Sequence, residues 1–424
     1  MGLYVNIPKP TAWPPPLIGS QRANDLLEYG AKRDPVGDIV QAYLAALFMF
    51  TLPIDTAPAS IAYIAVVVHG VLRTSSTWRT FIPLVNSKIY QLFFLWVAWL
   101  LISLFWSDDP QQGLDHAKAL WATSLLFVFL PLVKHWKLFV SAFLCGVFLQ
   151  NCAQITQIIQ GLITDIPVSR PGGFNKHYGN SSLFMGTGVL IYIALIVFSN
   201  KHRWYLYVGL ILALFGVLVA QGRGVYVGLV ATFICLGIYK IVSQKISAKG
   251  IMVTLVIALS AIATASFTVG PSMMHRINDI PKSIERFTNG DIETGNEKRL
   301  VWWSAGLNRS VSSPTKFLFG HGLGSTKSIA HQEVKLNTTH PHNVFVQTLF
   351  EGGLVGLVLL LALLSIPLCL FKCGPNSTTV ALSSVTILWI CAGMFEGLQN
   401  SGPTLALLSV IFLFTFNERL RVKS

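Results

Sequence analysis

The sequence around His342 combines the residue types that proton transfer requires. His340-Pro341-His342-Asn343 lies between a polar segment and a long apolar run. Imidazole gains and loses a proton near neutral pH, so a histidine at such a boundary suits general acid–base catalysis. Pro341 can end one helix and start the next, which places His342 in or just before a first helical turn. The positive end of the helix dipole favours a neutral ring there, and we predict His342 as a general base.

Two arginines lie where an anion would stabilise them. Arg223 occupies a very short turn between two apolar runs and has no acid nearby in the sequence. A guanidinium group at the hydrocarbon edge is costly unless it pairs with an anion or reaches water, and snorkelling to the interface is the alternative. Arg299 lies near the start of a predicted helix, 296–311, whose exposed amides also attract anions, unless this is simply a solvated helix face. Because guanidinium groups bind phosphate bidentately, we predict that both arginines bind a diphosphate.

The acidic residues are few and do not form a recognisable metal site. Asp108 and Asp109 are adjacent and precede a proline, a pattern typical of a turn or helix cap. The six cysteines form no CxxC pair, which argues against a zinc site or a disulfide framework. We therefore predict chemistry without a metal ion or other cofactor. Glu351 and Glu396, each followed by glycine, either orient His342 or fold helix ends.

These groups must be positioned at a lipid bilayer, because the composition is that of a membrane protein. Of 424 residues, 53% are hydrophobic and 12% are charged, and the mean hydropathy is +0.59. A soluble domain carries about 25% charged residues. The composition excludes intrinsic disorder and a small disulfide-stabilised fold. It also argues against nucleic-acid binding despite a net charge of +13, because excess Lys and Arg in a membrane protein more often reports topology.

Recurring apolar runs predict an all-α, polytopic integral membrane protein with about twelve transmembrane helices. The runs are continuously apolar rather than alternating, which argues against a β-barrel. The polar, proline-rich residues 1–38 lack the pattern of a cleaved signal peptide and are interpreted as a tail. The predicted spans cover residues 39–53, 58–72, 89–105, 120–133, 138–158, 182–199, 205–220, 225–242, 251–269, 349–371, 379–395 and 403–416.

The distribution of charge predicts that both termini face the cytoplasm. With the N-terminus inside, the predicted cytoplasmic segments hold eighteen Lys and Arg residues, whereas the short external loops hold four: Lys118, Arg170, Lys176 and Arg223. This is a strong positive-inside bias. The nine remaining basic residues lie in one long external segment, and such segments cross the membrane largely regardless of charge.

That long external segment, 270–342, is the unusual feature of the organisation. Connections of this length are usually functional or disordered. The stretch 296–311 has Asn296 as a plausible N-cap and one apolar face, formed by Leu300, Trp303 and Leu307. Glycines at alternate positions over 320–324 predict a turn and lack the ending of a nucleotide-binding loop. We predict a partly helical cap over the outer membrane surface.

The spacing after His342 resembles a family signature. His342-Asn343, nine residues, Gly353, two residues and Gly356 are similar to the signature of the O-antigen ligase family, in the superfamily of O-antigen polymerases and bacterial O-oligosaccharyltransferases. The glycines alone are also explained by close helix packing. The location of the signature, after a long external segment and beside a late apolar run, agrees with the same family.

Four other stretches agree with this resemblance. Residues 221–224 (Gln-Gly-Arg-Gly) resemble the family's arginine flanked by small residues, and Arg299 resembles its loop arginine. Residues 106–110 (Trp-Ser-Asp-Asp-Pro) and 170–175 (Arg-Pro-Gly-Gly-Phe-Asn) resemble two further landmarks. The last landmark departs from the family pattern at 176–180, where Lys-His-Tyr-Gly-Asn replaces the more usual Asn-Pro-Asn run.

The resemblance implies a GT-C-like membrane glycosyltransferase of a Gram-negative inner membrane, active on the periplasmic face. The expected reaction transfers a glycan from undecaprenyl diphosphate to a sugar hydroxyl of lipid A–core, with inversion and without ATP, metal or cofactor. The expected partners are these two lipids and the bilayer, with no nucleic acid. His342 is the expected base, and Arg223 and Arg299 hold the diphosphate. Further candidates for binding the diphosphate or glycan are Arg170, Lys176, His340 and Asn343.

The predicted organisation has five parts along the chain. A cytoplasmic tail (1–38) precedes transmembrane helices 1–9 (39–269), and a periplasmic loop with catalytic residues (270–342) follows. Transmembrane helices 10–12 (343–416) and a cytoplasmic tail (417–424) complete the chain.

Two alternative functions remain compatible with the sequence. An O-antigen polymerase or a protein O-oligosaccharyltransferase shares the architecture and differs only in the acceptor. A secondary transporter usually has ionisable groups near the bilayer midplane and repeated halves. The predicted spans here are nearly free of charge and no repeat is evident, which favours external chemistry.

Overall fold

The computed structural model describes most of the chain in nine pieces. These are residues 20–165, 170–175, 177–198, 203–243, 281–286, 288–289, 295–327, 341–373 and 376–422. The predicted span 251–269, the site candidates Lys176 and His340, and much of the predicted periplasmic loop lie outside the described residues.

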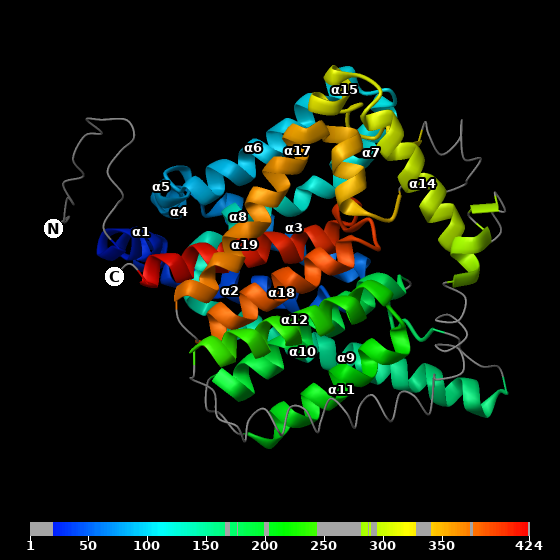
Figure 1. Ribbon diagram of the computed structural model, residues 1–424. Helices are drawn as coiled ribbons and strands as arrows, with labels where there is room; N and C mark the ends of the chain where they lie inside the picture. The colour runs from blue at the N-terminus through cyan, green and yellow to red at the C-terminus, as the bar shows by residue number, and fades with distance from the viewer. Residues whose placement is uncertain are drawn as a thin grey trace.

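The described residues confirm an all-α fold, because their regular elements are all helices. Short 3-10 segments (η) alternate with α-helices (α), with the labels of Figure 1. The elements are α1 (Ser20–Arg33), α2 (Pro35–Thr51), α3 (Thr56–Leu72), α4 (Thr74–Thr77), η1 (Trp78–Phe81), α5 (Ile82–Val85), α6 (Lys88–Ile102), η2 (Ser103–Trp106), α7 (Pro110–Ala117), η3 (Lys118–Ser124), α8 (Leu125–Phe129), η4 (Leu130–His135), α9 (Trp136–Ile163), α10 (Tyr178–Phe198), α11 (Trp204–Ala220), α12 (Arg223–Ser243), α14 (Gly295–Ser310), α15 (Pro314–Phe319), α17 (Val344–Leu368), η5 (Cys369–Cys373), α18 (Ser377–Gly393), η6 (Leu398–Asn400) and α19 (Gly402–Val422).

Several helices are long and apolar enough to cross a membrane. Within the described ranges four segments meet this condition: Lys88–Trp106, Pro110–Ile163, Tyr178–Phe198 and Val344–Lys372. A fifth span is possible if α3 and the segment Thr74–Val85, which meet at an angle of 69°, count as one. Shorter apolar helices accompany them, including α2, α11 and α18. These helices support a polytopic membrane protein, and the number twelve stays a prediction.

The predicted span 120–133 is not one regular α-helix. It consists of the five-residue α8 between the 3-10 segments η3 and η4. The hydroxyl groups of Thr123 and Ser124 donate to the carbonyls three residues earlier, at 2.7 and 2.8 Å, and so compete with α-helical bonding. Pro131 lacks the N–H group that a continuous helix needs. The apolar pattern predicted burial correctly here, but these local bonds decide the helix type.

The helix α19 lies in the middle of the bundle. Its side chains from Leu405 to Phe416 are almost all buried. Figure 1 shows α10, α12, α18 and α19 running alongside one another, with α14 along the opposite end from α1. Since a helix that is apolar all round must be surrounded, this arrangement explains why α19 has no polar face over most of its length.

Charged residues predicted to be cytoplasmic meet at the end of the bundle that carries α1. Arg73 is 5% exposed; its Nε donates to Asp34 Oδ2 at 2.7 Å, and its Nη2 lies 4.0 Å from Asp38 Oδ1. Lys134 Nζ lies 2.8 Å from Asp38 Oδ2. The hydrogen bond from Arg73 lowers the pKa of Asp34 below its ordinary value. Three segments predicted to share one side of the membrane therefore lie together.

Candidate active site

His342 lies directly before helix α17 in a turn that is held from both sides. Asn343 is the N-cap residue, and its Oδ1 accepts hydrogen bonds from the backbone N–H groups of Phe345 and Val346 at 3.0 and 3.1 Å. Trp303, from α14, donates its indole N–H to the carbonyl of Pro341 at 2.8 Å. The predicted start of a helix at this point is confirmed. The side-chain oxygen of Asn343 therefore caps that helix.

The backbone of His342 has a left-handed conformation, with φ = +51°. This region costs an L-residue about 1–2 kcal/mol, although histidine occupies it more readily than most. Strained residues of this kind persist where the surrounding contacts fix them, and they concentrate at functional sites. The imidazole of His342 is 27% exposed.

Glu396 joins the side chains of His342 and Arg299. Its Oε2 lies 3.4 Å from His342 Nδ1, and its Oε1 lies 3.9 Å from Arg299 Nη2. Glu396 follows α18, and its backbone N–H donates to the carbonyl of Ala392 at 3.0 Å. His342 and Arg299, from different segments of the chain, thus share one carboxylate, and of the two roles open for Glu396 the structure favours contact with His342.

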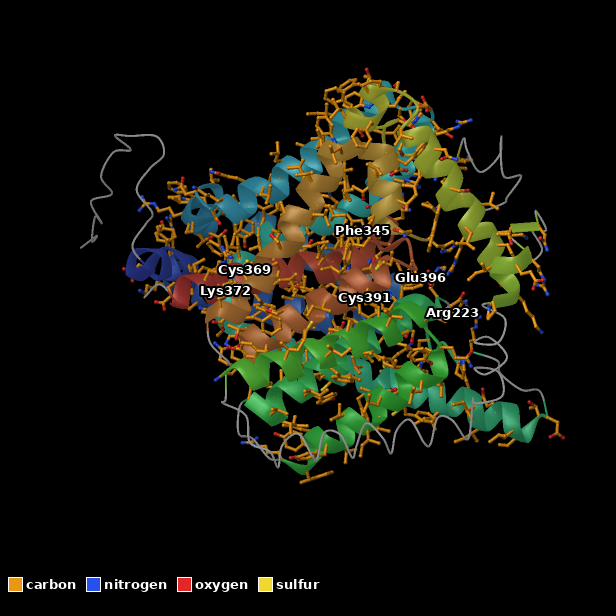
Figure 2. All side chains as sticks on the ribbon, in the orientation of Figure 1. Arg223, Phe345, Cys369, Lys372, Cys391 and Glu396 are labelled. Carbon is orange, nitrogen blue, oxygen red and sulfur yellow. The ribbon has the colours of Figure 1, made fainter. Side chains whose placement is uncertain are left out.

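Arg223 lies at the same end of the molecule. It is the first residue of α12, after Gln221, which adopts a left-handed conformation that ends α11. A side chain on Gly224 would lie 3.2 Å from the Cβ of Phe395, the residue before Glu396. The small residues around the arginine therefore allow α12 to approach the end of α18. Figure 2 shows Arg223 and Glu396 at one end of the helices, and Cys369 and Lys372 at the other.

Gly353 breaks α17 nine residues after its start. Its φ is +66°, and a Cβ there would lie 2.3 Å from the carbonyl oxygen of Leu318 and 2.5 Å from the N–H of Gly320. The backbone N–H groups of His321 and Gly322 donate to the carbonyls of α17 just before the break, at 2.8 and 2.9 Å. Gly353 therefore has the predicted packing role, and it packs the backbone of α17 against the backbone of 318–320. Only glycine fits both the positive φ and the short distance to that backbone.

The glycine-rich stretch 320–324 forms the predicted turn, and Glu351 organises it. The side chain of Glu351 is fully buried, and its Oε1 accepts from the N–H of Gly324 at 3.1 Å and the hydroxyl of Thr326 at 3.0 Å. His116 Nδ1 lies 3.4 Å from the same oxygen. Of the two roles open for Glu351, its contacts are those of a residue that folds this region, not of one that touches His342.

Residues 106–110 pack against this turn. Asp109 caps α7 by accepting from the N–H of Gln112 at 3.0 Å, which confirms the predicted cap. Asp108 Oδ2 lies 2.7 Å from Nδ1 of His321, whose ring stacks on Phe350. Residues 106–110 and the turn 320–324 therefore hold the first half of α17, and with it His342, in place.

The predicted apolar face of the external helix is shifted in the structure. Helix α14 buries Trp302 against Phe350 of α17, whereas Leu307 is 43% exposed. Gly306 of α14 lies against Val346 of α17, where an added Cβ would be 3.4 Å from the valine side chain. This packing places Arg299, 24% exposed, beside Glu396.

Arg170 lies at the rim of the same end. Its guanidinium carbon is 4.5 Å from the ring centre of Tyr178, the first residue of α10. A side chain on the next residue, Gly179, would lie 3.4 Å from the carboxyl carbon of Glu396. Asn180 donates to the hydroxyl of Ser401 at 3.2 Å, which ties α10 to the segment after α18.

Three glutamines of α9 form contacts that sequence reasoning missed. Gln150, Gln154 and Gln157 lie on one face of the helix, and their amides hydrogen-bond to the backbone of 171–174. The available signal was their spacing of four and three residues within an apolar run, which places polar groups on a single face.

Comparison with known proteins identifies a family for the middle part of the chain. Residues 208–361 match the family model described as O-Antigen ligase. The chain carries an O-antigen ligase family domain. The resemblance inferred from the sequence is thereby confirmed, and the matched segment contains Arg223, Arg299 and His342.

An uncharacterized protein of Haemophilus influenzae is 23% identical over 324 residues, which cover 72% of this chain and 77% of that protein. Its name states no activity.

The O-antigen ligase domain presents an imidazole and two guanidinium groups at one end of a membrane-type bundle, and Glu396, beyond the matched residues, adds a carboxylate. An imidazole paired with a carboxylate can accept a proton, and guanidinium groups can stabilise phosphate oxygens. The arrangement suits the transfer of a group from a phosphate leaving group to a nucleophile that must lose a proton.

Proposed function

We propose that the protein is a glycosyltransferase that joins a glycan from undecaprenyl diphosphate to a sugar hydroxyl of lipid A–core, on the periplasmic face of the inner membrane. One observation carries this proposal: Glu396 contacts both His342 and Arg299, two residues of the O-antigen ligase domain. A proton acceptor and a phosphate-binding group thus share a neighbour.

In the proposed mechanism His342 takes the proton of the acceptor hydroxyl. Glu396 Oε2 lies 3.4 Å from Nδ1, so in the proposed mechanism this carboxylate accepts a hydrogen bond from Nδ1–H once the substrates are bound, which leaves Nε2 as the proton acceptor. The acceptor oxygen attacks the anomeric carbon as its proton passes to Nε2. The new carbon–oxygen bond forms on the face opposite the leaving group, which inverts the anomeric centre.

The arginines would stabilise the group that leaves. The bond between the anomeric carbon and the diphosphate oxygen breaks, and the electron pair goes to that oxygen. Arg223 and Arg299 donate hydrogen bonds to the diphosphate, whose negative charge increases in the transition state. The lipid diphosphate is already an activated leaving group, so the transfer needs no nucleotide. Two guanidinium groups supply the positive charge that a metal ion supplies elsewhere.

A purified assay tests the proposal. Protein in detergent is incubated with a lipid-linked glycan and lipid A–core, without nucleotide and with excess EDTA, and the joined product is detected by electrophoresis. We expect product in EDTA. A donor polymerised onto itself would favour the polymerase, transfer to a Ser or Thr peptide would favour the protein glycosyltransferase, and no transfer to any acceptor would contradict the proposal.

A further inference from the structure

We infer that the loop 170–175 forms a second anion-binding subsite, in which glutamines of α9 position Arg170 for an acidic group of a substrate. The inference rests on the proposed function and adds a binding residue, Arg170, and a positioning residue, Gln157, outside the matched O-antigen ligase domain.

The loop is held by side chains along its length. The amide of Gln157 donates to the carbonyl of Gly173 at 2.6 Å and accepts from the N–H of the same residue at 3.0 Å. Gln150 donates to the carbonyl of Gly172 at 2.5 Å and accepts from the N–H of Phe174 at 3.0 Å. Gln154 donates to the carbonyl of Pro171 at 3.1 Å. Five hydrogen bonds from one helix face therefore fix four consecutive residues.

This arrangement is more than a connection between α9 and α10 requires. The side chains of Gln150 and Gln154 are fully buried in an apolar helix, where each amide is costly unless it is bonded. Gly173 has φ = +66°, and a Cβ there would lie 2.7 Å from the amide of Gln150, so the loop and the helix fit each other closely. Such buried, bonded polar groups make the position of the loop specific.

The loop holds an arginine whose charge has no partner among the described carboxylates. The guanidinium of Arg170 lies over Tyr178 at 4.5 Å, whereas Arg299 has Glu396 at 3.9 Å. Stacking uses the face of the guanidinium and leaves its N–H edge to donate. Tyr178 is followed by Gly179, where an added Cβ would lie 3.4 Å from the carboxyl carbon of Glu396, so Arg170 stacks on the part of α10 that approaches the proposed active site.

The ligand of such an edge is a phosphate or a carboxylate, because both accept two parallel hydrogen bonds. Either substrate can supply it: the donor through its diphosphate or an acidic sugar, the acceptor through an acidic group of its core. The two sources differ in which Michaelis constant the arginine controls.

The test is a double-mutant cycle on steady-state transfer kinetics. The variants are Arg170→Ala, Gln157→Leu and the two combined, with Gln160→Leu as the matched control, since Gln160 is an exposed glutamine of the same helix. We expect Arg170→Ala and Gln157→Leu each to raise one KM about tenfold, the value of one charged hydrogen bond, with kcat within about twofold. The combined variant should be no worse than Arg170→Ala alone.

The outcomes separate the source of the anion from the validity of the inference. A raised donor KM assigns the subsite to the donor, and a raised acceptor KM assigns it to the acceptor. Unchanged KM values in Arg170→Ala, or additive effects in the combined variant, overturn the inference while the proposed function stands. If the wild type transfers no glycan, the proposed function fails by itself. Equilibrium binding of inorganic pyrophosphate to wild type and Arg170→Ala then decides the subsite, and equal affinity overturns it.

Discussion

At the scale of single residues, Glu396 connects the candidate site, because its carboxylate contacts both His342 and Arg299. The motif around His342 and the two arginines predicted candidate side chains for catalysis, because imidazole transfers protons near neutral pH and a guanidinium group at a membrane edge is stabilised by an anion. The sequence left the role of Glu396 open, since its contacts join segments far apart in the chain and depend on how α18 ends beside α17. Local pattern cannot resolve such a contact.

Replacement of His342 tests the proposed base. His342→Ala should lower the transfer rate by about a hundred- to ten-thousand-fold, the usual contribution of general acid–base catalysis, and leave donor binding largely intact. Product formation is measured with purified protein, and donor affinity is measured separately. His135→Ala, which removes a histidine beside Asp38 at the opposite end of the bundle, is the comparison. Normal product yield from His342→Ala would remove the base from the mechanism.

Replacement of the arginines tests bidentate phosphate binding. Arg223→Lys and Arg299→Lys keep the charge but lose the planar pair of donors. We expect each to slow transfer by about tenfold or more, because a hydrogen bond to a charged group contributes about 1.5 kcal/mol or more. Initial rates at saturating donor are compared with those of Lys316→Arg, a charge-preserving change on α15. Full activity of both lysine variants would show that charge alone is sufficient.

Helix α17 shows how an element can be predicted while its shape is not. Its apolar run predicted a long helix after His342, and the helix is there. The break at Gly353 could not be predicted from spacing, because a glycine that packs helices and a glycine that reverses φ look the same in sequence. What distinguishes them is the turn 320–324, which donates backbone hydrogen bonds into the break.

A matched pair of glycine substitutions tests the break. Gly353→Ala places a methyl group 2.3 Å from a carbonyl oxygen and costs a further 1–2 kcal/mol, roughly, for its φ of +66°. Gly237→Ala, in helix α12, has no atom within 4 Å of the added methyl group. We expect a lower unfolding temperature and loss of transfer for Gly353→Ala, and little change for Gly237→Ala, by thermal unfolding in detergent. Equal stability of the two variants would contradict the role of the break.

At the scale of the whole molecule, two separate clusters of charged side chains lie at the two ends of the bundle. The count of Lys and Arg predicted which loops share a side, and the contacts agree: Arg73, Asp38 and Lys134 meet at one end, and His342, Arg299 and Glu396 meet at the other. Periodicity did not predict the face of α14 that packs, nor the 3-10 segments around α8. The packing face of α14 depends on its contacts with α17, and the 3-10 segments depend on hydrogen bonds from side-chain hydroxyl groups. Hydropathy records neither.

The cluster around Arg73 predicts a dependence of stability on pH. The lowered pKa of Asp34 means that this carboxylate stabilises the folded state above its ordinary pKa of 3.8, and that the contribution is lost as pH falls through the folded value. Asp34→Asn should therefore lower the unfolding temperature at pH 7, and the difference from wild type should shrink toward pH 3. Asp165→Asn, which changes an exposed carboxyl group, is the control. A constant difference across this range would contradict the assignment.

The shared carboxylate also has a consequence for the order in which the substrates act. Without a donor, Glu396 is divided between a guanidinium and an imidazole, at 3.9 and 3.4 Å. A pyrophosphoryl lipid that recruits Arg299 would leave the Glu396 carboxylate to orient the imidazole alone. An acceptor arriving first would meet an imidazole whose carboxylate partner is still shared with Arg299. We expect ordered binding with the donor first, so that the imidazole is fully oriented only when a glycan is bound for transfer.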